Sequence, residues 1–408
     1  MRPLRILHVI ASLAPRYGGP SQVCVELCQE LARAGEHVSI YTTNLDGPGT
    51  LDVPCQVPVW VNGVEVRYFP VQSPRRYALS LPMARALRWT IPEQDLVHNH
   101  SLYFFPTTVS AHLCRRAGVP YVVRPHGTLD PYHFRHHRGR KWVYERLFEW
   151  RNLNRAAAIH FTTREEQELT RPLGLTAPGV VVSPGVHAER YQDGDRTGGA
   201  FRDEWPKTRG RRIVLFLGRL TEKKGLDLLV AAFGQLARQR EDVHLVLAGP
   251  DNDGYGRTVR RWLEAERILD RSTFTGMLLG SRKHAALRAA DLFALPSYTE
   301  NFGVAVVEAM ASGLPIVISN RVNIWREVAD AGAGLVVNCD VGEVARAMAS
   351  VLSDPAARTT MGERARRLVA ERFTWPAAGK RMVEVYREIV EARNRSDLSV
   401  PSPKEACK

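Results

Sequence analysis

Residues 213–237 read IVLFLGRLTEKKGLDLLVAAFGQLA and decide the fold class. The first five are an uninterrupted apolar run, which is typical of a strand buried on both faces of a parallel sheet. From Leu226 onward the apolar residues recur at the three- and four-residue spacing of a helix. The polar loop 218–225 joins the two elements. The stretch therefore predicts a strand–loop–helix unit of an α/β fold.

The same alternation continues on both sides of this unit. Strands are predicted at 4–10, 38–42, 64–69, 96–98, 121–124, 158–161, 180–183, 213–217, 243–248, 272–275, 292–295, 316–318 and 334–337. Helices are predicted at 20–34, 105–117, 141–154, 164–173, 226–237, 255–265, 282–289, 304–311 and 341–352. Strands that alternate with helices are joined by right-handed crossovers and build mostly parallel sheets.

The length of the chain predicts more than one domain, because 408 residues exceed what a single hydrophobic core usually serves. The alternating pattern pauses at 193–211, which is polar and rich in glycine. We therefore expect one Rossmann-like domain at 1–190 and a second at 191–373. An amphipathic helix at 374–395 and a polar tail at 396–408 follow. Two such sheets in one chain normally leave a cleft that binds a ligand at the strand carboxyl ends.

Composition and charge narrow the class of protein. With 44% apolar and 24% charged residues, the chain is neither disordered, collagen-like nor a coiled coil. Lys and Arg exceed Asp and Glu by 13, which favours nucleic acid, an anionic membrane or phosphorylated small molecules as partners. No apolar run reaches the roughly 18 residues of a membrane span, and the N-terminal run is too short for a signal peptide. We expect a cytoplasmic protein.

Several common motifs are missing from the sequence. The loop after the first strand lacks Gly-x-Gly-x-x-Gly, and no P-loop, nucleophile elbow or His-Glu-x-x-His helix occurs. The cysteines form no CxxC pair and no zinc spacing. Cys24 and Cys28, four apart on a predicted helix, are interpreted as buried small residues. The Asp-x-Asp strings at 193–195 and 251–253 are interpreted without a metal role, so we expect no metal cofactor.

Two loops of the second half carry charged side chains that suit a ligand. Arg219 and Lys224 lie in the loop 218–225, where free N–H groups and the helix dipole favour an anion, although both could also be solvated surface cations. The loop after the strand at 292–295 carries Glu300, and an apolar helix that begins near Gly303 carries Glu308. A buried Glu308 carboxylate needs a partner, either the vicinal hydroxyls of a ribose, solvent or an arginine.

These residues resemble the GT4 family of retaining glycosyltransferases, which have the GT-B fold. Glu300 and Glu308 match the family's Glu-x7-Glu signature, and 218–225 resembles its diphosphate motif. The resemblance covers nearly the whole chain, although 183–186 reads Ser-Pro-Gly-Val in place of the usual Pro-Asn-Gly-Val. It implies two doubly wound Rossmann-like domains that face each other across a cleft, with the C-terminal helix returning to the N-terminal domain.

The resemblance implies a role for each candidate residue of the second half. Arg219 and Lys224 are expected to bind the donor diphosphate and stabilise it as it leaves. Glu308 is expected to hold the ribose, and Glu300 the transferred hexose. Further donor contacts are expected from the glycines and amides of the two loops, namely Gly218, Asn301, Phe302 and Gly303.

In the first half, the resemblance implies that Gly18 and Gly19 approach the diphosphate. His126 matches the family histidine beside the anomeric carbon, although a single histidine is more often a structural hydrogen-bonding group. Asp130 either assists the acceptor or starts a helix. The segment 132–144 has four fixed cations, three histidines and no acid. We expect it to bind the acceptor through Arg135 and Arg138, with an anionic bilayer, single-stranded nucleic acid or plain solvation as alternatives.

The activity implied is retaining transfer of a hexose from a nucleotide-diphosphate sugar to a glycan or lipid-linked acceptor, in bacterial polysaccharide or glycoconjugate synthesis. The expected mechanism is front-face attack without a metal, at the inner face of the membrane or in the cytoplasm. A GT-B-fold sugar phosphorylase or epimerase is an alternative. A basic nucleic-acid-binding protein is another, but it would leave Glu300 and Glu308 without a role.

Overall fold

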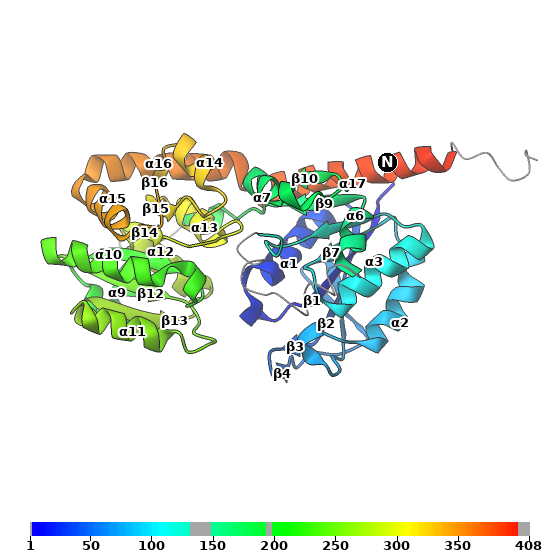
Figure 1. Ribbon diagram of the computed structural model, residues 1–408, viewed down its shortest axis with the longest axis horizontal. Coiled ribbons are helices and arrows are strands. Elements are labelled where there is room, and N and C mark those ends of the chain that lie inside the picture. The colour runs from blue at the N-terminus through cyan, green and yellow to red at the C-terminus, as the bar shows by residue number, and fades with distance from the viewer. Residues whose placement is uncertain (1, 131–147, 193–197, 399–408) are drawn as a thin grey trace, which may run out of the picture. The chain divides into compact units, whose positions relative to one another are not determined.

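A computed structural model describes residues 2–130, 148–192 and 198–398 (Figure 1). The chain forms two compact units, 1–184 with 375–408, and 185–374. The change of unit thus falls six residues before the boundary predicted at 190/191. The C-terminal helix belongs with the first unit. Among the described residues, no helix combines the length and the apolar character needed to cross a bilayer.

The first unit contains a sheet with the strand order β10-β9-β8-β7-β1-β2-β6-β5. All neighbours pair in parallel except β5 and β6, which form an antiparallel hairpin. The strands are β1 Arg5–Ser12, β2 His37–Thr43, β5 Pro58–Val61, β6 Val64–Phe69, β7 Leu96–His100, β8 Tyr121–Arg124, β9 Ala158–Phe161 and β10 Gly179–Val181, with β3 Leu45–Asp46 and β4 Gly49–Thr50 as a separate pair. β1 lies inside the sheet, between β7 and β2, and seven of its eight residues are therefore buried.

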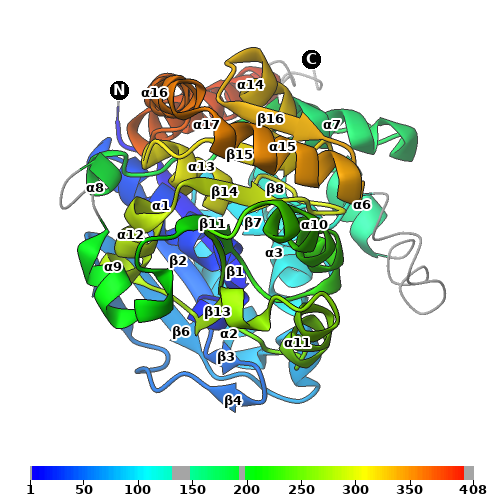
Figure 2. The ribbon, with the colours of Figure 1, turned by 90° about the vertical axis from the view of Figure 1, so that its left-hand side faces the viewer.

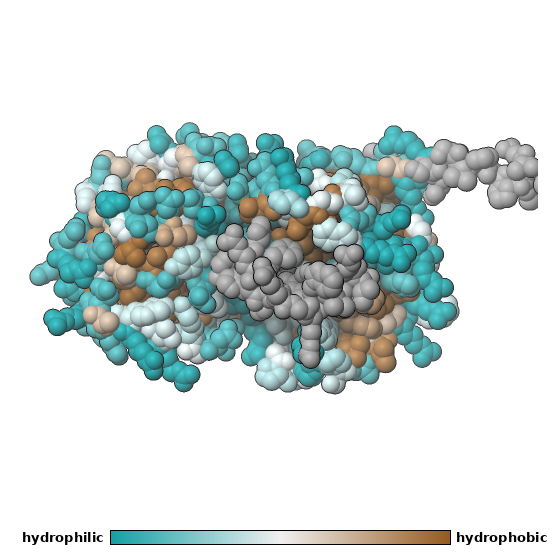
Figure 3. All heavy atoms as spheres, viewed as in Figure 1, coloured by the Kyte–Doolittle hydropathy of each residue, from teal (hydrophilic) through white to brown (hydrophobic). Residues whose placement is uncertain are grey.

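Helices cover both faces of this sheet (Figure 1). They are α1 Gly19–Arg33, α2 Leu81–Thr90, α3 Phe105–Ala117, α6 Trp150–Asn154, α7 Arg164–Thr170 and α17 Trp375–Leu398. The C-terminal helix α17 lies against α1, where Gly379 permits close packing because a Cβ there would stand 2.7 Å from Cβ of Glu30. An ion pair of Arg387 with Glu36 holds the same helix. Figure 3 shows hydrophobic side chains at the surface beside α2.

The second unit is built on an all-parallel sheet with the order β13-β12-β11-β14-β15-β16. Its strands are β11 Arg212–Leu217, β12 Val243–Ala248, β13 Ser272–Gly276, β14 Leu292–Leu295, β15 Ile316–Ser319 and β16 Gly334–Val337. Its helices are α8 Glu189–Gln192, α9 Gly199–Glu204, α10 Leu226–Gln239, α11 Gly256–Ala265, α12 Gly280–Ala289, α13 Val304–Ala311, α14 Trp325–Asp330, α15 Val341–Ser353 and α16 Pro355–Arg372. Figure 2 shows α10 and α15 on one side of the sheet and α9 and α12 on the other.

The strand order of the second unit reverses between β11 and β14. From β11 the chain proceeds to β12 and β13 on one side, and from β14 to β15 and β16 on the other. The loops that leave the carboxyl ends of β11 and β14 therefore diverge at a switch point, which is where open α/β sheets bind ligands. The predicted fold class, with two Rossmann-like halves, is confirmed.

Some elements differ from the sequence-based prediction. Helices α2, α14 and α16 were not predicted, and α9 lies in the segment interpreted as irregular. The reason is clearest for α16, whose charged residues surround a narrow buried stripe formed by Gly362, Ala365, Leu368 and Val369. The last helix continues to Leu398, into the predicted polar tail. Of the helix predicted at 141–154, only the part from 148 lies within the described residues, where α6 begins at Trp150.

Candidate active site

The loop between β11 and α10 passes close to the loop after β14. A short helix, η7 Glu222–Lys224, leads into Gly225, whose φ of +64° is in the left-handed region. A Cβ at Gly225 would stand 2.0 Å from the carbonyl oxygen of Pro296. Glycine is thus required here both by its backbone conformation and by the close approach of the two loops. As a result, the start of α10 lies beside the segment that carries Glu300.

Lys224 and Glu300 form an ion pair across these two loops. Their side chains are 13% and 17% exposed, so the pair is largely shielded from water. Arg219 is exposed and has no ion-pair partner within the described part of the chain. Burial, with the positive charges of Lys223 and Arg219, lowers the pKa of Lys224 to about 7, even though the Glu300 carboxylate touches its amine. The site therefore holds an amine that gains from a second anion.

Binding of a nucleotide sugar is expected to weaken as the pH rises above 7. A diphosphate bound beside Lys224 would favour the protonated amine and raise the pKa of Lys224 from its value of about 7, so binding would take up a proton. Affinity should fall by up to about tenfold per pH unit above pH 7, until the pKa of the complex is passed. Calorimetric titration across this range measures the slope. Lys224→Arg, which stays charged, should flatten it; an equal slope in that variant would contradict the assignment.

The Glu300 loop is held at both ends by backbone hydrogen bonds. The Glu300 N–H donates to the carbonyl oxygen of Arg321 at 3.0 Å, and its own carbonyl accepts from the N–H of Asn323 at 3.0 Å. The Tyr298 N–H donates to the Lys223 carbonyl at 2.8 Å. The Tyr298 hydroxyl also donates to Oδ2 of Asp227 at 2.6 Å. The loop is thus fixed to its neighbours before any ligand binds.

Glu308 is buried on α13 and has two partners that the sequence did not predict. Its Oε1 accepts from Nζ of Lys283, in α12, at 2.6 Å, and from the hydroxyl of Tyr191, in α8, at 2.9 Å. Glu308 is only 5% exposed, so these contacts compensate for its burial. The charged partner of Glu308 is thus Lys283, in place of the solvent or arginine considered from the sequence.

Phe302 and Gly303, just before α13, leave backbone atoms rather than side chains for contact with a ligand. Gly303 has a φ of +80°, and a Cβ there would stand 3.1 Å from Cγ2 of Val306. The Phe302 ring is buried against Phe373 in an edge-on contact with the ring centroids 5.5 Å apart. Only the backbone of Phe302 is therefore left for a ligand, which suits the amide role that the resemblance implied. Asn301 and Gly218 lie in the same two loops.

In the first unit, the glycine pair lies at the start of α1, with Gly18 just before the helix and Gly19 as its first residue. Gly18 has a φ of +71°, which explains the glycine there. A Cβ at Gly18 or Gly19 would meet nothing within 4 Å inside the protein. Gly19 is therefore not required by packing, and open space lies in front of the first turn of α1.

His126 follows β8 in a strained loop that a buried carboxylate holds in place. Its φ is +53°, which is unusual for a residue with a side chain. Next to it, the Gly127 N–H donates to Oε1 of Glu166 at 3.1 Å. Burial, with the charge of Arg124, holds the pKa of His126 well below its usual range, so the imidazole is neutral at pH 7. Asp130 closes the turn by donating its N–H to the Gly127 carbonyl at 3.2 Å.

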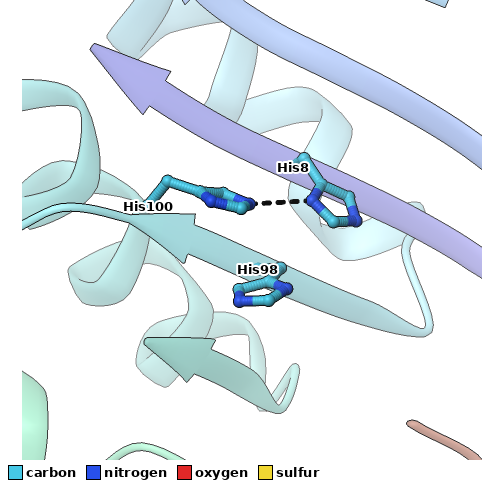
Figure 4. A group of neighbouring side chains, drawn as sticks. All are labelled: His8, His98 and His100. Carbon is cyan, nitrogen blue, oxygen red and sulfur yellow. Dashed lines mark hydrogen bonds between the residues drawn. The ribbon is translucent and has the colours of Figure 1, made fainter. Parts of the chain in front are cut away.

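His126 is the first of a series of hydrogen-bonded imidazoles. Its Nε2 lies 3.1 Å from Nδ1 of His100, and Nε2 of His100 lies 2.9 Å from Nδ1 of His8 (Figure 4). His98, two residues before His100, lies beside them. This series of imidazoles was not predicted from the sequence. The alternation His98–Asn99–His100 on a strand was the available signal, since a period of two puts both imidazoles on one face.

The predicted site residues are divided between the two units. The donor candidates Arg219, Lys224, Glu300 and Glu308 belong to the second unit, and Gly18, Gly19, His126 and Asp130 to the first. Arg135 and Arg138, the predicted acceptor residues, lie outside the described residues, as does the Asp-x-Asp string at 193–195.

Family profiles match both units. Residues 17–190 match the profile described as Glycosyltransferase Family 4, and residues 199–368 match Glycosyl transferases group 1. The chain belongs to the GT4 family of glycosyltransferases. The expectation from Glu300, Glu308 and the loop 218–225 is thereby confirmed at the level of the family.

Individual relatives agree with this assignment. The chain is 28% identical to D-inositol 3-phosphate glycosyltransferase 2 of Catenulispora acidiphila, over 96% of this chain and 93% of that one. It is 29% identical to the alpha-D-kanosaminyltransferase of Streptomyces kanamyceticus, over 70% and 74%. Among solved structures, Anabaena Alr3699/HepE in complex with UDP-glucose superposes with a TM-score of 0.77 at 20% identity, covering 94% of this chain and 100% of that chain. The last similarity concerns the fold.

Proposed function

We propose that this glycosyltransferase moves a hexose from a nucleotide-diphosphate sugar to a glycan or lipid-linked acceptor with retention of configuration. The observation that carries the proposal is the Lys224–Glu300 pair at the switch point of the second unit, beside the start of α10. An amine, a nearby guanidinium and a helix N-terminus suit a diphosphate. The UDP-glucose named for the Anabaena structure supports a sugar nucleotide as the donor.

In this proposal, the diphosphate takes the place of Glu300 as the partner of Lys224. Arg219 and the amine of Lys224 then face the charge that develops on the leaving diphosphate, and this fixed positive charge lowers the barrier. Glu300, released from the lysine, accepts hydrogen bonds from the hexose hydroxyls, and Glu308 accepts from the ribose. The departing phosphate takes the acceptor proton in a front-face reaction. Because the cations supply the charge stabilisation, the reaction needs no divalent metal.

A donor screen tests the reaction class. We expect product with one of the UDP-, GDP- and ADP-sugars, at a rate that excess EDTA leaves unchanged, since Arg219 and Lys224 replace a metal at the diphosphate. The acceptors tested also include D-inositol 3-phosphate, the acceptor in the name of the relative, as a small-molecule alternative to a glycan or lipid-linked acceptor. NMR of the product reports whether the anomeric configuration is retained. Transfer to inorganic phosphate alone would indicate a phosphorylase instead, and a rate that requires added Mg²⁺ would contradict metal independence.

We further propose that the first unit approaches an anionic membrane through α2 and the residues before it. Segment 71–92 contains four arginines and no acidic residue. Leu81 and Trp89 are 59% and 69% exposed. The Arg88 guanidinium lies over the Trp89 ring at 5.6 Å from its centroid. Exposed aromatic and basic side chains on one helix are typical of interfacial binding.

Flotation with anionic liposomes at low salt is expected to carry the protein upward. The double variant Arg85→Glu, Arg88→Glu should lose at least about tenfold in partitioning, since each arginine near an anionic surface contributes about 1 kcal/mol. Trp89→Ala should also lower the flotation. Its matched control is Trp60→Ala, which should leave flotation unchanged, because Trp60 is equally exposed at 69% but lies opposite the acidic Glu65 in the β5–β6 hairpin. Equal flotation of all variants would contradict this surface.

A further inference from the structure

A group of metal-binding side chains is buried inside the first unit. His8 lies on β1, and Cys24 and Cys28 lie four residues apart on α1, so both thiols face the same side of the helix. All three side chains are fully buried. One ligand atom from each lies within 4.8 Å of the other two. Neighbouring β1 residues Leu7 and Val9 belong to a hydrophobic cluster, so His8 points to the opposite face, toward α1.

One imidazole nitrogen of His8 lacks a hydrogen bond of ordinary geometry, although the imidazole interacts with the Cys24 thiol beside it. Nδ1 of His8 is hydrogen-bonded to His100 at 2.9 Å, but Nε2 is buried and has no hydrogen-bond partner among the described residues. Buried polar atoms in folded proteins are nearly always satisfied, so this nitrogen calls for a ligand. His98, by contrast, uses both nitrogens, toward the Tyr386 hydroxyl at 2.6 Å and toward His160 at 3.4 Å.

The residue types of the group suit a transition metal. Cysteine binds a metal as the thiolate, so a cation here would displace the thiol protons of Cys24 and Cys28. Cys114 is a buried thiol of the same unit that lies outside the group.

We propose that His8, Cys24 and Cys28 form a structural site for one divalent cation of the zinc class in the interior of the first unit. Two thiolates and an imidazole are a ligand set typical of zinc, and two ligands four apart on a helix are a recurrent arrangement. Tetrahedral zinc holds such atoms about 3.3–3.8 Å apart, a range that lies within the 4.8 Å limit on the separations in this group.

The second possible ligand set, His8, His98 and His100, is less suited to the metal. It would break the bond from His98 to Tyr386 and would bring no negative charge to a fully buried cation. Two thiolates neutralise the cation, which makes burial possible. The metal would join α1 to β1 inside the first unit, whereas the cations expected at the diphosphate, Arg219 and Lys224, belong to the second unit. The inference is therefore independent of the proposed reaction.

Metal analysis of the full chain tests this site. The untagged protein is purified from zinc-supplemented cells and measured by inductively coupled plasma mass spectrometry. We expect one zinc per chain in the natural sequence and in the matched control Cys114→Ser, and none in Cys24→Ser or Cys28→Ser. Because the ligands are fully buried, EDTA should remove the metal only after guanidinium is added. Substoichiometric metal in the natural sequence, from supplemented cells and after refolding with zinc, would overturn the proposal.

Refolding with Co²⁺ identifies the ligands even if a cysteine variant does not fold. The natural sequence and Cys114→Ser should gain a thiolate-to-cobalt charge-transfer band and the visible bands of tetrahedral cobalt. Bound cobalt without a charge-transfer band would exclude Cys24 and Cys28 as ligands and overturn the proposal. Neither readout depends on transferase activity, so a failure here is distinguishable from a failure of the proposed reaction.

Discussion

Lys224→Ala is expected to lower kcat by about 10²–10³-fold, the usual cost of removing one fixed group that stabilises developing charge. The amine lies beside the start of α10, and burial lowers its pKa to about 7, so it gains most when the diphosphate becomes more negative. Arg219→Ala should have an effect of the same order, because the exposed guanidinium has no ion-pair partner among the described residues. Steady-state kinetics with the donor from the screen measure both variants.

The neighbouring Lys223→Ala is the control for Lys224→Ala, since it removes an equal charge from the same turn but not the amine that touches Glu300. It should retain kcat within a few-fold. The melting temperature of Lys224→Ala should fall, because Glu300 is only 17% exposed and loses its partner, so kcat is compared well below the melting temperature of the variant. Unchanged kcat in both Lys224→Ala and Arg219→Ala would show that the diphosphate binds elsewhere.

The sequence predicted the elements that position this loop because their pattern is local. β11 is central in a parallel sheet, so residues 213–217 form an unbroken apolar run. All five residues of this run are buried, and only Arg212 at the start of the strand is partly exposed. The start of a helix after a short polar loop then places Lys224 at a strand carboxyl end. Once the strand order is known, the loop after β14 must lie beside the loop after β11. The close approach of Gly225 to Pro296 then follows.

The contacts that complete the site were not predictable in the same way, since they join elements far apart in the chain. Lys283 reaches Glu308 across 25 residues and Tyr191 reaches it across 117. In the first unit, Glu166 holds the His126 loop across 39 residues. A charged residue on an amphipathic helix has no periodicity that distinguishes a buried partner from a solvated one. How the helices pack decides whether such a residue meets a buried partner or solvent. The pattern of a single sequence does not reveal that packing.

Glu308→Gln is expected to raise KM for the donor by about 10- to 100-fold, because a hydrogen bond to a charged group contributes about 1.5–3 kcal/mol. The amide can still accept from Lys283 and Tyr191 but loses the charge that the ribose hydroxyls would meet. Glu264→Gln, an exposed residue of α11, is the matched control and should leave KM unchanged. A donor KM equal to that of the natural sequence in Glu308→Gln would remove Glu308 from the ribose site.

Stability measurements separate this role from the structural one, because Glu308 also compensates a buried lysine. Glu308→Ala leaves Lys283, whose side chain is only 15% exposed, without its carboxylate, which should cost about 2–4 kcal/mol of unfolding free energy. The double variant Glu308→Ala, Lys283→Met should recover most of that loss, since no buried charge remains. Its donor KM should stay raised, because restoring the packing does not restore the ribose acceptor. Recovery of both quantities together would mean that Glu308 acts only through the fold.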